Sequence, residues 1–418
     1  MAHENSNSHS SPPFSYNSMK TTFGFLPMAK REQLARKCQE VRGIESTLPY
    51  PPFDTVCFRA YTFEVDDRRF GFHVDASDSD TRDTNGWRAE DVTDEVVPDD
   101  ILCTSPMDEP LPRYLRNGDE EAEDVTHTCP NFRRRAYKGV LRVRIHVANR
   151  FVDCRRFDDV TRSAVLERKL IGSYLGKRGV IHVNHLLLES SEGVYRVPAG
   201  LKMRVRHLST GWSYADEVMT RFEPLIDDAS FPLETVTVCV SRRDDPVIDH
   251  HIFRSAKRVE VLLEVLYEGA IVSKFLPLTN RDIYFKCRDF PHTDIIAFVE
   301  KMVAEGREPG TTVSFAVKKY RKIVNLQNAL VANNGAARGV LESTGNLHCV
   351  SIPMLDGVEL NVYAYKSGSK TPSINHWTTK MKWLLKLEVM RAGSATIDRK
   401  MWERTVHSVQ TLFKRIVS

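Results

Sequence analysis

Long apolar segments are missing from this sequence. No stretch of the 418 residues approaches the roughly 18 consecutive apolar residues that a membrane-spanning helix needs. The opening residues, MAHENSNSHSSPPFSYNSMK, have neither the basic start nor the apolar centre of a secretory signal. We therefore expect no membrane contact and a location in the cytoplasm or the nucleus.

Closely spaced cysteines are also missing. No two of the eight cysteines stand within four residues of each other, which excludes the CxxC pair of a structural zinc site. In a reducing compartment we expect such cysteines to be buried or free thiols. They are Cys38, Cys57, Cys103, Cys129, Cys154, Cys239, Cys287 and Cys349.

Signatures of common catalytic and nucleotide-binding sites are missing as well. There is no GxGxxG after an expected strand, no GxxxxGK[ST], no HExxH and no GxSxG. The adjacent His250 and His251 suggest a metal site, but neighbouring side chains of an extended segment point in opposite directions. We expect a non-enzymatic protein without catalytic residues, cofactor or metal ion.

Charge is distributed unevenly along the chain. Residues 75–128 contain 17 Asp and Glu against 4 Arg, a net charge of −13, whereas the whole chain carries +4 and the remainder therefore +17. Three interpretations of this uneven charge stay open. The acidic segment is a solvated loop, or it screens the basic remainder of the chain, or the basic remainder is a surface that binds an acidic partner.

The N-terminal part combines polar, helical and alternating segments. We expect residues 1–22 to be a disordered leader and residues 23–46 to be a short helical segment, with Pro27 in a first turn. Residues 53–75 contain two alternating, aromatic-rich runs separated by Asp66-Asp67-Arg68-Arg69, which predicts a β-hairpin. The acidic, proline-bearing residues 76–136 are expected to be a largely disordered insert.

Short β-type runs recur through the next segment, residues 137–292. After a strand at 140–147 and a helix at 160–175, apolar runs begin at Val180, Leu201, Leu233, Ala256 and Arg281. Their spacing of roughly 20–30 residues is typical of a leucine-rich-repeat-like stack of parallel strands with helical returns, one of them at 212–225. An ordinary α+β domain with unevenly spaced strands is the alternative.

The C-terminal part, residues 293–395, is predicted to hold a helix and four strands. The helix covers 293–306 and ends at Gly306, and the strands cover 312–317, 347–353, 359–365 and 383–390. Asp356-Gly357 predicts a tight turn between the second and third strands. Residues 396–418 are expected to form a basic amphipathic helix, and the fold class is α+β.

Several stretches resemble a large nematode-expanded family of uncharacterised F-box-related proteins that carry an F-box-associated domain. The matching stretches occur in the family's order between residues 53 and 395. They are PAGLKMRVRHL, IDDASFPLETVTV, FRSAKRVEV, DIIAFVEKMVAEGREPGTTVSFAV, SIPMLDGVELNVY and LLKLEVMRAGSA.

Residues 23–46 resemble the second half of that family's F-box, the small helical motif that docks the adaptor Skp1. The resemblance implies a substrate-recognition subunit of a Skp1-cullin-F-box type ubiquitin ligase, bound to an unidentified target protein. The alternative is a protein-interaction scaffold without ligase coupling, because the F-box-like segment is short. The positions that the resemblance assigns to Skp1 binding are Phe25, Leu26, Leu34, Cys38, Val41 and Ile44.

Basic residues alternate on two of the expected strands, so each set lies on one strand face. We select these residues and one tryptophan as candidate partner-binding residues. They are Arg142, Arg144, Lys202, Arg204, Arg206 and Trp212. A solvated outer face, an acidic protein partner or the chain's own acidic insert each explains the basic sets, and nucleic acid is a weaker alternative because no known nucleic-acid module is readable.

Overall fold

The computed structural model describes most of the chain between residues 15 and 397. The described residues are 15–26, 28–48, 52–59, 62–76, 101–103, 139–147, 150–157, 170–366 and 383–397, except for 173, 177–178, 190–192, 196, 199, 212–214, 241–245, 264–273, 288–290, 334–335 and 345–346. Among the described helices, none is both long and apolar enough to span a bilayer.

A single mixed sheet dominates the described structure. Its N-terminal strands are β1 (Phe53–Arg59), β2 (Thr62–Val65), β3 (Arg68–Ala76), β5 (Gly139–Val147) and β6 (Arg150–Phe157). Each of these five strands is antiparallel to the next. A separate two-stranded sheet joins β4 (Ile101–Cys103) to β8 (Gly193–Tyr195).

The centre of the sheet is a run of parallel strands. Its members after β1 are β7 (Val180–Leu188), β9 (Lys202–Thr210), β10 (Thr235–Val240), β11 (Arg258–Leu263), β12 (Asp282–Cys287) and β13 (Thr312–Val317). Each strand is parallel to the one before it. The five runs that the sequence places at a spacing of roughly 20–30 residues are therefore neighbours in one sheet, which confirms that they form parallel strands.

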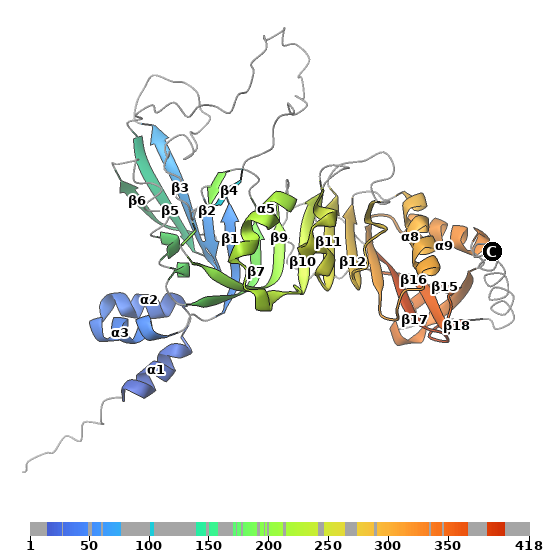
Figure 1. Cartoon of the computed structure of the whole chain (residues 1–418), viewed down its shortest axis with the longest axis horizontal. Coiled ribbons are helices and arrows are strands. Elements are labelled where there is room, and N and C mark those ends of the chain that lie inside the picture. The colour runs from blue at the N-terminus through green and yellow to red at the C-terminus, as the bar shows by residue number, and fades with distance from the viewer. Residues whose placement is uncertain are drawn as a thin grey trace, which may run out of the picture.

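The C-terminal end of the sheet is antiparallel again. Its strands are β14 (Ala337–Leu341), β15 (Leu347–Pro353), β16 (Val358–Lys366), β17 (Trp383–Arg391) and β18 (Thr396–Ile397). The described sheet has 16 strands in the order β18-β14-β15-β16-β17-β13-β12-β11-β10-β9-β7-β1-β2-β3-β5-β6. Figure 1 shows it running along the molecule, with β6 near one end and β18 near the other.

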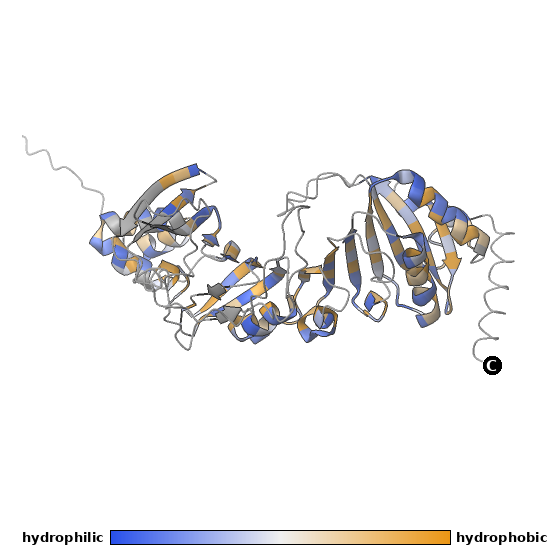
Figure 2. Ribbon diagram, turned by 90° about the horizontal axis from the view of Figure 1, so that it is seen from above, coloured by the Kyte–Doolittle hydropathy of each residue, from blue (hydrophilic) through white to orange (hydrophobic). Residues whose placement is uncertain are grey.

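Apolar residues on one face of this sheet form the main core. In one row the register aligns Val236, Val259, Ile283, Val313 and Leu387, all of them fully buried. Helices α5 (Ala215–Phe222), α6 (His251–Ser255), α8 (His292–Glu305) and α9 (Tyr320–Asn333) contribute side chains to the same core. Figure 2 shows these helices along one side of the central strands, as the shared core requires.

The helix predicted for 293–306, the turn at Asp356-Gly357 and the return helix predicted for 212–225 are found in the structure. Gly306 follows α8 with φ 62°, a left-handed conformation that glycine adopts without steric cost. Asp356 and Gly357 both have positive φ between β15 and β16, as a two-residue hairpin turn needs. The return helix predicted for 212–225 is α5 followed by a 3-10 turn, η3 (Glu223–Leu225). Helix α9 and strand β14 were not predicted.

Several predictions for the termini need correction. Residues 16–22, assigned to a disordered leader, belong to helix α1 (Tyr16–Gly24), which Ser15 caps by accepting a hydrogen bond from Ser18 N–H. The hairpin predicted for 53–75 is three strands, because Arg59 pairs with Thr62 and the chain reverses between them. Residues 396–397, assigned to a terminal helix, form β18 instead.

Other predictions fall partly outside the described residues. In the insert assigned to 76–136, residue 76 ends β3 and residues 101–103 form β4, while the rest is not described. Of the helix predicted for 160–175, residues 170–172 and 174–175 are helical and lie in the described part. The terminal helix beyond residue 397 and the leader before residue 15 also lie outside it.

The assignment of the two sheet faces predicts different effects for two adjacent substitutions on β12. Phe285 is fully buried against Phe275, Phe298 and Phe315, with ring centroids 5.3 Å apart in each pair. We expect Phe285→Ala to lower the free energy of unfolding by about 3–5 kcal/mol, because it leaves a cavity in the core.

The matched control is Tyr284→Ala, one residue away on the opposite face. It should lower the free energy of unfolding by only about 1 kcal/mol, since it removes part-exposed surface and a contact with Arg258. Urea denaturation followed by circular dichroism measures both. Equal losses from the two variants would contradict the assignment of the faces.

Candidate functional site

The side of the sheet opposite the helices carries polar and aromatic side chains over its central strands. We call this surface the open face. It consists of Thr237 on β10, Arg258 and Glu260 on β11, Asp282 and Tyr284 on β12, Thr312 and Ser314 on β13, and Lys386 and Glu388 on β17.

Alternation of side-chain direction produces the open face, and it is clearest on β11, whereas all six residues of β13 are buried. On β11 Val259 and Val261 are fully buried, whereas Arg258 and Glu260 between them are part-exposed. Because successive side chains of a strand point to opposite faces, every second residue joins the core and the rest form the open face. The register then places Arg258 beside Asp282, and Asp282 beside Thr312.

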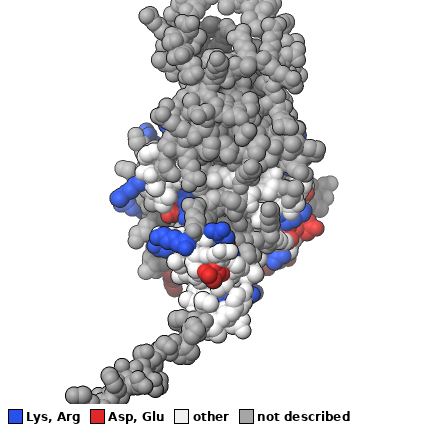
Figure 3. Space-filling model, turned by 90° about the vertical axis from the view of Figure 1, so that its left-hand side faces the viewer, with Lys and Arg blue, Asp and Glu red and all other residues white. Residues whose placement is uncertain are grey.

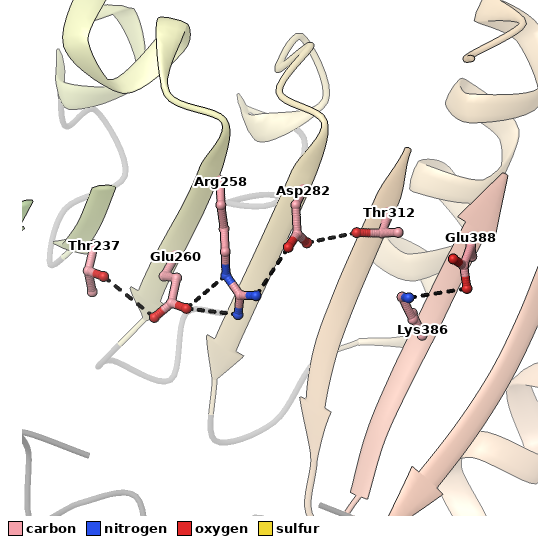
Figure 4. Close-up of polar contacts among 7 residues, drawn as sticks. All are labelled: Thr237, Arg258, Glu260, Asp282, Thr312, Lys386 and Glu388. Carbon is pink, nitrogen blue, oxygen red and sulfur yellow. Dashed lines mark hydrogen bonds and ion pairs between the residues drawn. The ribbon is translucent and has the colours of Figure 1, made fainter. Parts of the chain in front are cut away.

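Arg258 is at the centre of polar contacts that connect four neighbouring strands, β10 to β13 (Figure 4). Its Nε donates to Glu260 on its own strand at 3.0 Å, and its Nη1 donates to Asp282 on β12 at 3.1 Å. The Thr312 hydroxyl donates to the other Asp282 oxygen at 2.7 Å, and the Thr237 hydroxyl donates to Glu260 at 3.4 Å. The two carboxylates and the guanidinium therefore hold each other in fixed positions.

A second group of polar contacts continues the open face onto β17 and β16. Lys386 Nζ lies 3.1 Å from Glu388 and 6.0 Å from the centre of the Tyr363 ring. The Tyr363 hydroxyl donates a hydrogen bond to Glu388. Burial and then the Glu388 carboxylate raise the pKa of Tyr363, so its hydroxyl stays protonated.

Tyr284 adds an aromatic surface between these two groups. The Arg258 guanidinium lies 5.7 Å from the centre of its ring, within reach of a cation–π interaction. Burial raises the pKa of Tyr284 to about 12 and also raises that of Tyr365. The open face thus offers neutral hydroxyls, paired charges and ring surface. These groups suit recognition by hydrogen bonding and packing.

The predicted partner-binding residues do not form one surface. Arg144 is exposed on β5, whereas Lys202, Arg204 and Arg206 are exposed on β9, with four strands between. Arg204 pairs with Asp227 at 3.1 Å, which lowers the pKa of that carboxyl. The Arg142 side chain and Trp212 lie outside the described part.

Lys202 also has a contact within the chain, because its Nζ donates to the Pro224 carbonyl at 2.7 Å. Among the described residues, the Arg206 side chain has no hydrogen bond or ion pair. The basic set on β9 is therefore partly occupied by the chain's own acceptors, which favours the open face as the principal candidate surface.

His250 and His251 lie close together, contrary to the argument from an extended segment. His250 precedes helix α6 and His251 begins it, so their rings stack with centroids 4.9 Å apart. His251 Nε2 lies 3.0 Å from the Glu223 carboxylate, and the three side chains have the spacing that a metal ion needs.

The hydrogen bonds of His250 assign it to helix capping. Its Nδ1 accepts from Ile252 N–H at 3.2 Å, so the proton of the neutral ring is on Nε2, which lies 3.2 Å from the Thr220 hydroxyl. A histidine nitrogen that binds a metal ion must carry no proton and must not already accept a hydrogen bond, and neither nitrogen of His250 meets both conditions. The trio is therefore best described as a helix cap beside an ion pair.

The residues predicted to bind Skp1 lie in a three-helix unit made of α1, α2 (Met28–Lys37) and α3 (Gln39–Thr47). Ile44 is buried with Phe23 and Leu48, and Leu26 and Val41 pack against this small core. Phe25 is 85% exposed, Leu34 is also exposed and Cys38 is half-buried. Phe25 and Leu34 are thus the members of the set available to a partner.

Arginine side chains fasten the three helices together. Arg31, although 2% exposed, donates from Nε to the Leu26 carbonyl at 3.0 Å and from Nη2 to the Gly24 carbonyl. Arg42 donates to the Ala35 carbonyl at 3.2 Å. Figure 3 views this end of the molecule and shows Lys and Arg side chains on its surface.

Comparison with known proteins adds one finding. Residues 167–319 match the model of a domain of unknown function, DUF3557. The match spans β7 to β13 and includes Arg258, Asp282 and Thr312, but it ends before Lys386 and Glu388. Searches of curated proteins and of solved structures found no match.

The residues of the open face are not among the candidate residues predicted from the sequence. Alternation in AKRVEV and RDIYFK was visible and indicated the outward positions of Arg258, Glu260, Asp282 and Tyr284. Their partnership depends on strand register, which a single sequence does not give.

The cap formed by His250 predicts a pH dependence of stability. Burial lowers the pKa of His250 below its usual value of 6.5, so the folded state favours the neutral ring. Just below pH 6.5 the unfolded chain therefore binds more protons than the folded chain. The stabilisation that is present above this pH is lost as the pH falls toward the lower pKa of His250 in the folded state.

We expect His250→Asn, which keeps a capping side chain, to reduce this loss of stability as the pH falls below 6.5. Urea denaturation of the two proteins across this range measures the difference. Contributions of the other histidines cancel in the comparison. Parallel stability curves for the two proteins would show that His250 does not titrate with unfolding.

Proposed function

We propose that this chain is a non-enzymatic protein-binding adaptor, with a target protein held on the open face and an adaptor of the Skp1 type docked on the helical unit. The observation that carries the proposal is the connected array of Arg258, Glu260, Asp282 and Thr312 on adjacent strands. Arg258, Glu260 and Asp282 are part-exposed, Thr312 is buried beside them, and all four are hydrogen-bonding groups.

The parallel strands support this function through their geometry. They fit a leucine-rich-repeat-like stack, in which each unit adds one strand and returns by a helix on the far side. Such a stack extends a surface sideways without a deep pocket, which suits a protein surface better than a small molecule. Tyr284 supplies an amphipathic ring of the kind that is enriched at interfaces.

The resemblance to F-box-related proteins supports the second half of the proposal. The unit α1–α3 has three helices around a small core, and Phe25 and Leu34 lie on its surface. Helix α1 makes the F-box-like region longer than the sequence alone indicates. A ubiquitin-ligase adaptor would act in the cytoplasm or the nucleus.

Two alternatives remain for this architecture. A scaffold without ligase coupling would keep the open face and use the helical unit for another contact. A nucleic-acid binder that uses the basic strand faces is less favoured, because Arg204 and Lys202 on β9 already contact Asp227 and the Pro224 carbonyl.

A photo-crosslinking pair tests the open face. We expect p-benzoylphenylalanine in place of Tyr284 to form a discrete protein adduct in cells, and the same residue in place of the exposed Tyr320 on α9 to form none. In the chain with p-benzoylphenylalanine at position 284, the further substitution Arg258→Glu should reduce the amount of adduct by about tenfold. The reason is that it places a third carboxylate beside Glu260 and Asp282.

Arg321→Glu on α9 is the matched control for that charge reversal, and it should leave the Tyr284 adduct unchanged. Circular dichroism confirms that each variant is folded. Equal labelling from Tyr284 and Tyr320 would rule out the open face as a binding surface.

The helical unit has a separate test. The double variant Phe25→Ala and Leu34→Ala should weaken binding of purified Skp1 by about tenfold or more, since it removes two exposed apolar contacts. Leu355→Ala, in the exposed turn before β16, is the matched control and should have no effect. Calorimetry with the full chain measures the affinity, and no binding by the unmodified protein would leave the scaffold alternative.

A further inference from the structure

Strand β6 forms a long edge of the described sheet. It pairs with β5 along one side, from Arg150 opposite Val147 to Phe157 opposite Leu141. No described strand pairs with its other side, whereas the opposite edge of the sheet is β18, only two residues long. The eight residues of β6 include no proline, and, apart from the bulge at Val152, the N–H and C=O groups on their free side form a template for another strand.

Two neighbouring apolar side chains are exposed at this edge. Phe151 is 58% exposed and Val152 is 60% exposed. The pairing with β5 shifts here: Asp153 lies opposite Ile145 and Phe151 opposite His146, so Val152 is the extra residue of a β-bulge with no partner on β5. The Phe151 ring has an edge contact with His146 of β5, with centroids 5.6 Å apart, which leaves most of the ring free for a partner.

The charge of this edge is positive. Arg150 is exposed at the start of β6, and Arg144 is exposed on β5 opposite Cys154. The sequence of β6, RFVDCRRF, has three arginines and one aspartate, a net charge of +2. Two copies of this strand placed side by side would bring like charges together, which disfavours self-association.

We infer that the free edge of β6 binds an extended acidic peptide segment of a partner protein as an additional strand of the sheet. Main-chain hydrogen bonds to β6 provide the affinity in this mode, and alternate side chains provide the selectivity. The segment would place acidic side chains near Arg150 and Arg144, and apolar side chains beside Phe151 and Val152. This contact is independent of the open face and of the helical unit.

Hydrogen exchange with the full chain tests the inference. The probe is a short synthetic peptide in which Glu alternates with Val and Thr. We expect it to slow amide exchange in β6 and to leave exchange in β11 and β12 unchanged. The same peptide with Lys in place of Glu should bind at least about tenfold more weakly, because it meets like charges.

Two further measurements identify the mode of binding. The Glu peptide with alternate backbone amides N-methylated should lose binding, since strand addition needs those N–H groups. Arg150→Glu should weaken binding of the Glu peptide by about tenfold, and the matched reversal Arg321→Glu on α9 should not change it. Phe151→Ser provides a second edge variant with the same expected direction.

Three results would overturn the inference. The first is that the Glu peptide slows exchange only at amides outside β6. The others are that the N-methylated peptide binds as tightly as the Glu peptide, or that a single-stranded oligonucleotide slows exchange in β6 as much as the Glu peptide does. Self-association that Phe151→Ser abolishes, measured by light scattering, would assign the edge to a second copy instead. A failed crosslink at Tyr284 would leave the result at β6 unaffected, because the two surfaces are on different strands.

Discussion

The continuous register of the parallel strands is the constraint on which the rest of this structure depends. From β10 to β13 the strands pair without a shift, so Val236, Val259, Ile283 and Val313 form one apolar row across the sheet. The next residue position forms a polar row. A slip of one residue in any strand would exchange its two faces, burying a charge and breaking the contact between Arg258 and Asp282.

The two ends of the sheet differ in how they are closed. At the C-terminal end, the buried Glu359 carboxylate accepts hydrogen bonds from Ala395 N–H at 3.0 Å and Asn361 Nδ2 at 3.0 Å, which fixes the turn before the short β18. At the N-terminal end, β6 is four times as long as β18 and has exposed apolar residues. The described sheet therefore ends in a two-residue strand at one edge and in an eight-residue strand at the other.

Local patterns in the sequence predicted those features whose cause is local. Alternation predicted the parallel strands, and Gly306 and Asp356-Gly357 predicted a helix end and a turn, because left-handed backbone favours these residue types. Helix α1 was missed because its sequence, YNSMKTTFG, is polar with weak amphipathic character.

Contacts between distant segments could not be predicted in this way. Lys386 and Glu388 reach the open face only because β17 inserts next to β13, although the two strands are far apart in the chain. The His250 cap was misjudged for a related reason. The chain turns into a helix at that residue, which reverses the expected direction of its neighbour.

The extent of the matched domain bears on where the functional unit ends. The match to DUF3557 stops at residue 319, just after β13, yet all six residues of β13 are buried. If β13 were the edge of the sheet, its backbone would be unpaired and Thr312, Ser314 and Ala316 would lose the cover of their neighbours on β17. The residues after 319 are therefore needed to complete both the sheet and the open face, so the smallest unit that presents this surface is larger than the domain itself.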